Sequence, residues 1–165
     1  MRLITSDAHA GLRAARQTIF GGIPWQRCQF HLQQNARSYV PRKELHGEVT
    51  DDLRTIFNAP DLATAETWLK ETVQKYQDIS PRLATWIEQS LPEGLTVFSF
   101  PAAHRRRIRT SNMLERLSQE IRRRTRVVRL FPNEASCERL VTAILMETSE
   151  NWQTGKIYLS IEPTE

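Results

Sequence analysis

The pattern of hydrophobic and polar positions in residues 1–40 predicts a strand, a helix, a second strand and a second helix. Residues 3–5 fit the end of a short buried strand, and residues 10–20 place apolar side chains at helical spacing. Residues 25–30 are rich in large side chains, which favours a strand, and residues 31–39 begin a further helix. This order predicts an α/β unit at the start of the chain.

Residues 41–93 change to helical spacing and predict an all-helical block. Asp61 is expected to cap one of its helices, and Ser80 precedes a proline at the first position of another. Residues 94–101 are largely apolar and predict an extended segment that returns the chain towards the first unit.

Residues 94–150 as a whole are expected to rejoin the first unit through two helices. The first helix follows a cluster of capping residues at 110–112, and a break at 131–133 separates it from the second. Apolar residues at 140–145 give the second helix its buried face. Residues 151–165 are largely polar and predict a loose tail.

Positive charge is concentrated in one segment of the 165-residue chain, although 23 Lys and Arg residues against 19 Asp and Glu residues give a net charge of only +4. Between residues 105 and 129 the opposing acids are Glu115 and Glu120. The arginines of this stretch are Arg105, Arg106, Arg107, Arg109, Arg116, Arg122, Arg123, Arg124, Arg126 and Arg129. A charged stretch is often a solvated face, but arginine without lysine favours bidentate contact with phosphate. This composition predicts binding to the backbone of a nucleic acid.

Composition favours one compact fold in a reducing, cytosolic setting. A hydrophobic content of 39% is sufficient for a core at this length without disulfides. Cys28 and Cys137 are too few for a disulfide framework, and no apolar run approaches the roughly 20 residues that cross a bilayer. The apolar part of residues 1–7 is too short for a signal peptide, so we expect a soluble protein.

Asp7 directly follows the first predicted strand, at the edge of a sheet where α/β folds place ligands, and His9 lies in the turn after it. A carboxylate in that position can hold a metal ion. The alternative is that Asp7 or Ser6 only caps the following helix, which is the commoner arrangement for such local sequence.

Glu115 projects away from the apolar stripe of its predicted helix, on nearly the same line as Arg122. A carboxylate among arginines stays ionised and can hold a divalent metal beside a phosphate. Two alternatives remain open: a capping box formed by Asn112 and Glu115, and an ion pair of Glu115 with Arg122.

Cys28 and His31 have the C-x-x-H spacing that can place a thiolate and an imidazole on one zinc ion. Zinc normally needs three or four protein ligands, and the sequence offers no second pair. A packed cysteine and a histidine at the end of a strand are the preferred interpretation. A Cys/His nucleophile pair would lack a third group to orient it.

Four sequence blocks, in this order along the chain, resemble the Mutator-type transposases of bacterial insertion sequences. The blocks are SDAHAGL at residues 6–12, WQRC-x-x-H at 25–31, RTSNMLER at 109–116 and EIRRRTRVV-x-x-FPN at 120–133. The resemblance covers nearly the whole chain and implies an α/β, predominantly helical fold with an incomplete RNase H-like core. Residues 1–40 and 94–150 would form that core, and residues 41–93 would form an all-helical insertion.

The resemblance implies that Asp7 and Glu115 are two acids of a DDE triad that binds Mg²⁺ or Mn²⁺ for phosphoryl transfer on DNA. Residues expected to support the site are His9, Cys28, His31 and Asn112. Residues expected to contact DNA are Arg105, Arg106, Arg107, Arg109, Arg116, Arg122, Arg123, Arg124 and Arg126. The first aspartate of the triad has only residues 1–6 in which to lie, and none of them is acidic. We therefore expect a truncated transposase that is inactive alone.

The expected partners are transposon ends and target DNA, together with a full-length transposase, an upstream fragment or a second copy of the chain. The expected location is the bacterial cytoplasm, in association with the nucleoid. An alternative function is a non-catalytic regulator that binds transposon DNA or inhibits a full-length transposase. A weaker alternative is an unrelated basic helical adaptor.

Overall fold

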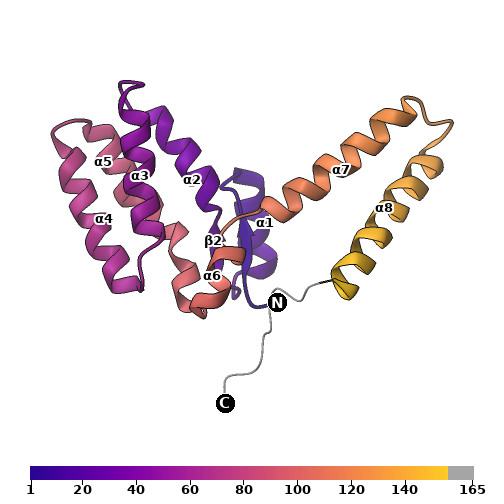
Figure 1. Ribbon diagram of the computed structural model, residues 1–165, viewed down its shortest axis with the longest axis horizontal. Coiled ribbons are helices and arrows are strands. Elements are labelled where there is room, and N and C mark those ends of the chain that lie inside the picture. The colour runs from indigo at the N-terminus through magenta and orange to yellow at the C-terminus, as the bar shows by residue number, and fades with distance from the viewer. Residues whose placement is uncertain (156–165) are drawn as a thin grey trace, which may run out of the picture. The chain divides into compact units, whose positions relative to one another are not determined.

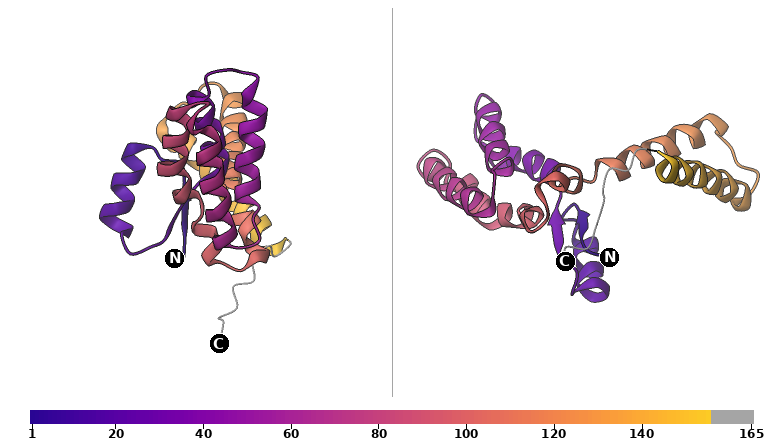
Figure 2. Two further views of the ribbon diagram at one scale, coloured as in Figure 1. Left: turned by 90° about the vertical axis from the view of Figure 1, so that its left-hand side faces the viewer. Right: turned by 60° about the horizontal axis from the view of Figure 1, so that its bottom comes forward.

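Residues 1–40 fold in the predicted order of strand, helix, strand and helix. The computed structural model describes residues 1–155, and its first elements are β1 (Ile4–Ser6), α1 (Ala10–Phe20), β2 (Trp25–Arg27) and α2 (Gln29–Ala36) (Figure 1). The two strands pair in parallel, with Ile4 opposite Trp25 and Ser6 opposite Arg27. Figure 2 shows α1 beside this small sheet. The other elements within residues 1–155 are helical, so the predicted α/β, predominantly helical class is confirmed.

The second strand is shorter than the sequence predicts. β1 offers pairing partners only as far as Ser6, so β2 ends at Arg27, opposite that residue. Cys28 then occupies the N-cap position of α2, which begins at Gln29 rather than at residue 31.

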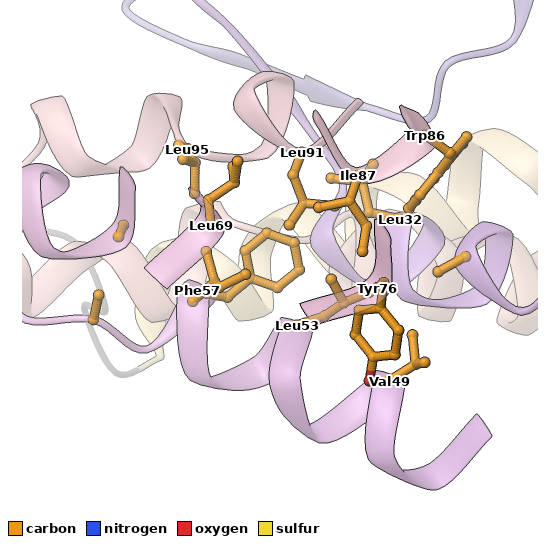
Figure 3. Packing of buried hydrophobic residues seen from close by; sticks show 14 of the residues in the cluster. Leu32, Val49, Leu53, Phe57, Leu69, Tyr76, Trp86, Ile87, Leu91 and Leu95 are labelled. Atoms are coloured by element: carbon orange, nitrogen blue, oxygen red, sulfur yellow. The ribbon is translucent and has the colours of Figure 1, made fainter. Parts of the chain in front are cut away.

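Three helices build most of the interior of the first compact unit, Met1–Ser111. They are α3 (Leu45–Phe57), α4 (Leu62–Gln77) and α5 (Pro81–Ser90), and the short 3-10 helix η1 (Arg37–Tyr39) joins α2 to this block. Their apolar faces meet in one core, in which Leu32, Leu53, Tyr76 and Ile87 are fully buried (Figure 3). The predicted cap of α4 is confirmed, because Asp61 accepts a hydrogen bond from the Thr64 N–H at 2.8 Å.

Residues 94–101 are not an extended segment, which corrects the prediction for this part of the chain. The backbone forms two 3-10 turns, η2 (Leu91–Gly94) and η3 (Thr96–Ser99), followed by α6 (Ala102–Ile108). The side chains of Leu95, Val97 and Phe98 are buried in the helical core. A strand would direct alternate residues to opposite faces, whereas tight turns allow these neighbouring apolar residues to share one core.

A buried glutamine joins the sheet to the helical block. The Gln26 side chain donates from Nε2 to the Gly94 carbonyl at 2.7 Å and accepts from the Val97 N–H at 2.8 Å. Gln29 donates to the same Gly94 carbonyl at 2.9 Å. All of these groups are buried, so β2 and the start of α2 are fixed to η2 and η3 by directional contacts.

Replacing Gln26 with leucine is expected to lower the free energy of unfolding by about 2 kcal/mol, because it leaves the buried Val97 N–H without an acceptor. Urea unfolding of the whole chain measures this loss. The matched control is Gln34→Leu, which changes an exposed glutamine of α2 and should be nearly neutral. Equal stabilities of the two variants would show that the Gln26 contacts do not stabilise the fold.

The second compact unit, Asn112–Glu165, is a helical hairpin over its described residues. It contains α7 (Asn112–Val128) and α8 (Glu134–Thr154), which lie side by side in Figure 1. An ion pair joins the helices, with Arg124 Nη1 2.7 Å from Glu147 Oε2, and Ile144 is buried. α8 continues through residues 151–154, so the predicted tail begins with helix; residues 156–165 lie outside the described part of the chain. The four-part division at residues 40, 93 and 150 stays a prediction.

No helix within residues 1–155 combines the length and apolar character needed to cross a membrane.

Candidate functional site

Asp7 lies at the carboxyl end of the two-stranded sheet. It follows Ser6, the last paired residue of β1, whose carbonyl accepts a hydrogen bond from the Cys28 N–H at 2.8 Å. The Asp7 side chain is partly buried, and its Oδ1 accepts from the His9 N–H at 3.1 Å. Within residues 1–155 its Oδ2 has no hydrogen-bond partner. One carboxylate oxygen is therefore fixed while the other can take a ligand.

The helix-cap alternative for Asp7 and Ser6 is wrong, because His9 is the N-cap residue of α1. The His9 ring accepts through Nδ1 from the Gly11 N–H at 3.2 Å. Ser6 Oγ instead accepts from the Trp25 indole N–H at 3.0 Å and donates to the Asp7 carbonyl at 2.8 Å. Asp7 and Ser6 thus shape the turn that precedes the helix.

Cys28 is fully buried, as the packed-cysteine interpretation predicts. Its Sγ accepts a hydrogen bond from Ser111 Oγ at 3.5 Å, in addition to the backbone bond of Cys28 to Ser6. His31 is partly buried on α2, with its ring edge-on to Phe30 at 5.6 Å between centroids. The backbone bond of Cys28 therefore joins the start of α2 to Ser6, the residue before Asp7.

The segment after α6 is fixed along the strand ends. Thr5 Oγ1 donates to the Ile108 carbonyl at 2.7 Å, and the Gln29 N–H donates to the Arg109 carbonyl at 3.0 Å. The Arg109 guanidinium reaches Asn58 Oδ1 at 2.8 Å, and burial, then the nearby Arg106, lowers its pKa. The backbone and side chain of Arg109 are therefore both held by contacts within the first unit.

Glu115 shares its side of α7 with two of the helix's arginines, Arg122 and Arg126. At about 100° per residue, Glu115 falls within about 20° of both Arg122 and Arg126 in projection, and Arg116 lies about 100° away. Leu114 and Ile121 fall on the other side of Glu115 from Arg116, about 100° to 120° away. Asn112 is exposed and already belongs to the first turn, one position beyond that expected of a capping residue.

The arginines of the basic segment divide into two groups. Arg105 is held by the fold: it donates to the carbonyl groups of Phe100, Pro60 and Phe98 and lies over the Phe98 ring. Arg123 and Arg124 pair with Glu120, whose pKa these hydrogen bonds lower to about 2. The remaining predicted contact residues are exposed: Arg106, Arg107, Arg116, Arg122 and Arg126.

The structure also shows an arginine cluster that the sequence patterns did not single out. We use this name for Arg13, Arg16 and Arg27 around Trp25 and Glu93. The Cζ atoms of Arg13 and Arg16 lie 5.2 and 4.8 Å from the centroid of the Trp25 ring. Glu93 accepts from Arg13 at 2.9 Å and from Arg27 at 3.0 Å. The spacing of Arg13 and Arg16 on one helix was the available signal, but nothing in the sequence indicates that Glu93 and Trp25 meet them.

Comparison with known proteins finds one matching family model and several similar sequences. A family model described as "Transposase, Mutator family" matches residues 1–155. The transposase for insertion sequence element IS406 of Burkholderia multivorans is 53% identical over 161 residues, which cover 98% of this chain and 42% of the relative. The transposase for ISRM5 of Rhizobium meliloti is 42% identical, over 98% of this chain and 40% of the relative. The transposase for IS1081 of Mycobacterium tuberculosis is 36% identical, over 97% of this chain and 38% of the relative.

Proposed function

Because the chain belongs to the Mutator family of transposases, we propose that residues 1–165 supply two acidic side chains and a DNA-binding surface to an insertion-sequence transposase. The chain spans about two fifths of the length of these relatives, so the activity of the whole enzyme is part of the proposal. An RNase H-like catalytic fold, with residues 41–93 as its insertion, is proposed on the same basis. The parallel pairing of β1 and β2 around α1 supports it.

The proposal rests on the position and hydrogen bonding of Asp7. Its place at the end of a parallel strand, with Oδ1 held by His9 and Oδ2 available, suits a ligand of a hard divalent cation, which prefers carboxylate oxygens. Mg²⁺ or Mn²⁺ bound there would stabilise the charge that develops on phosphate oxygens during strand transfer. His9 and Cys28 would keep Asp7 in position through their backbone N–H groups and the buried packing of Cys28.

Glu115 is proposed as the second carboxylate. Arg122 and Arg126, on the same side of α7 further along the helix, are suited to hold DNA phosphates along that side. Asn112 and His31 are proposed to support the site.

DNA binding is proposed for the exposed face of α7 formed by Arg116, Arg122 and Arg126. These guanidinium groups make no hydrogen bond or ion pair with other residues in the range 1–155, so they are available for phosphate. Arg106 and Arg107 of α6 are exposed and extend the predicted set. Arg105 and Arg109 are bound to carbonyl and amide oxygens of the fold, so we assign them to its support.

The metal proposal is tested by Mn²⁺ binding to the DNA-bound chain, measured by electron paramagnetic resonance. Asp7→Asn is expected to weaken Mn²⁺ binding by at least about tenfold, because it removes a charged ligand oxygen. The control Asp78→Asn removes an exposed carboxylate at the end of α4 and should leave Mn²⁺ binding unchanged. Equal Mn²⁺ affinities of the two variants would contradict a role for Asp7. A chain that binds DNA but does not bind Mn²⁺ would favour the non-catalytic regulator instead.

A further inference from the structure

We propose that the arginine cluster on α1 is a second phosphate-binding site, whose ligand is a phosphodiester of duplex DNA. The site lies apart in sequence from the basic segment at residues 105–129, and Arg16 is its principal contact residue. The choice of DNA as ligand rests on the proposed function. The cationic site itself follows from the charges and contacts around Trp25.

The cluster carries more positive charge than its own residues neutralise. The cluster holds three guanidinium groups and one carboxylate: Arg13 and Arg27 contact Glu93, and Arg13 and Arg16 lie over the Trp25 ring. Glu93 contacts only Arg13 and Arg27, and Arg16 forms no ion pair within residues 1–155. The Arg27 side chain is only 9% exposed, so solvent screens its charge poorly. An anion at this surface would balance the excess charge.

The donors of the cluster are also incompletely satisfied. The Nε atoms of Arg13, Arg16 and Arg27 are buried, and none has a hydrogen-bond partner in the described part of the chain. The Nη groups of Arg16 likewise make no hydrogen bond or ion pair with a carboxylate or carbonyl group within residues 1–155. Buried polar groups are normally paired, so the unmatched donors of Arg13 and Arg16, the two partly exposed side chains, favour a ligand that accepts hydrogen bonds.

Trp25 holds the cluster in a defined orientation. Its indole N–H donates to Ser6 Oγ at 3.0 Å, which fixes the ring against the strand that leads to Asp7. Arg13 and Arg16, one helical turn apart on α1, both lie over this ring. A guanidinium stacked on an aromatic ring is pre-organised and can still offer its N–H edge to phosphate in a bidentate contact.

The cluster is open to a large ligand on the α1 side. No residue of α1 is buried, the Arg13 side chain is 40% exposed, and Arg16 is partly exposed. Arg27 lies too deep for direct contact and contributes through its charge. Since Trp25 is bonded to Ser6, the residue before Asp7, a phosphate held here would place a DNA backbone beside the proposed catalytic carboxylate.

The test compares Arg16→Gln with Arg82→Gln in the whole 165-residue chain by measuring duplex DNA affinity over a range of salt concentrations. Arg82 is an exposed arginine of α5, so both variants lose one positive charge. Arg16→Gln is expected to reduce the slope of log affinity against log salt by about 0.9 and to weaken binding about eightfold near 0.1 M salt. Arg82→Gln should leave the salt slope and the DNA affinity unchanged. Arg16→Lys keeps the positive charge and should retain part of the DNA affinity.

A second measurement follows the indole N–H signal of Trp25 by nuclear magnetic resonance, assigned with Trp25→Phe. This signal should move when DNA is added to the native chain, which tests the site without any arginine substitution. DNA binding in which Arg16→Gln behaves like Arg82→Gln and the Trp25 signal stays still would overturn this inference alone. Absence of any DNA binding would overturn the proposed function as well. Saturation of the Trp25 shift by millimolar inorganic phosphate would show that the site takes free phosphate rather than DNA.

Discussion

Replacing Arg116, Arg122 and Arg126 together with glutamine is expected to weaken duplex DNA binding by about two to three orders of magnitude near 0.1 M salt. Each arginine that neutralises a phosphate releases a counterion and contributes about 0.9 to the salt slope, so the slope should fall by about 2.7. All three side chains are exposed on α7 and unpaired within residues 1–155, so the variant leaves no broken internal contact. Fluorescence anisotropy of a labelled duplex at several salt concentrations measures both quantities.

The control for net charge is the triple variant of Arg37, Arg42 and Arg82, which are exposed in the first unit. Both triple variants lower the formal net charge from +4 to +1, because each removes three of the chain's arginines. If DNA binds by overall charge alone, the two variants lose affinity equally. That outcome would contradict a binding face on α7.

Replacing Glu93 with glutamine is expected to lower the free energy of unfolding by about 2 to 3 kcal/mol. Glu93 is the carboxylate that faces both Arg13 and the buried Arg27, and its loss leaves the Arg27 charge without a counterion in a poorly solvated place. The expected value is below that for a fully buried pair, because the Glu93 side chain is itself 28% exposed. Urea unfolding followed by circular dichroism measures the change.

Glu88→Gln is the matched control, since Glu88 is an exposed residue of the neighbouring α5 and undergoes the same change of charge. A second arm uses Arg13→Gln, which should be milder because Arg13 is 40% exposed and can be solvated. Equal stability of the Glu93 and Glu88 variants would show that Glu93 does not offset the buried charge of Arg27.

Local sequence predicted the elements whose signals are short in range. The helix at residues 10–20, the cap at Asp61 and the break before α8 follow from spacing and capping chemistry, and all three are confirmed. The family resemblance drawn from four sequence blocks is also confirmed. These features depend on residues that are close together along the chain.

The predictions that failed depended on distant partners. β2 ends at Arg27 because β1 supplies no further partner, and residues 94–101 turn because the helical core buries Leu95, Val97 and Phe98. Asp7 does not cap α1, since the His9 ring takes that position. The arginine cluster depends on contacts of Glu93 with residues more than sixty positions away, which no local pattern indicates.

The assignments of Asp7 and Glu115 came from their place in the family blocks, because each had a plausible local alternative. The structure removes the cap alternative for Asp7 and leaves one of its oxygens available. Glu115 shares its side of α7 with Arg122 and Arg126, the residues proposed to bind DNA. The catalytic role of the two carboxylates stays a proposal.

The most direct test is the transposition frequency of an insertion sequence served by a chimeric enzyme. In this chimera the chain replaces the matching segment of the Burkholderia multivorans relative, to which it is 53% identical over 161 residues. We expect the chimera to transpose, Asp78→Asn to have no effect, and Asp7→Asn to lower the frequency at least about a thousandfold. A chimera that transposes equally often with Asp7→Asn and with Asp78→Asn would contradict the account, as would a folded, DNA-binding chimera that never transposes.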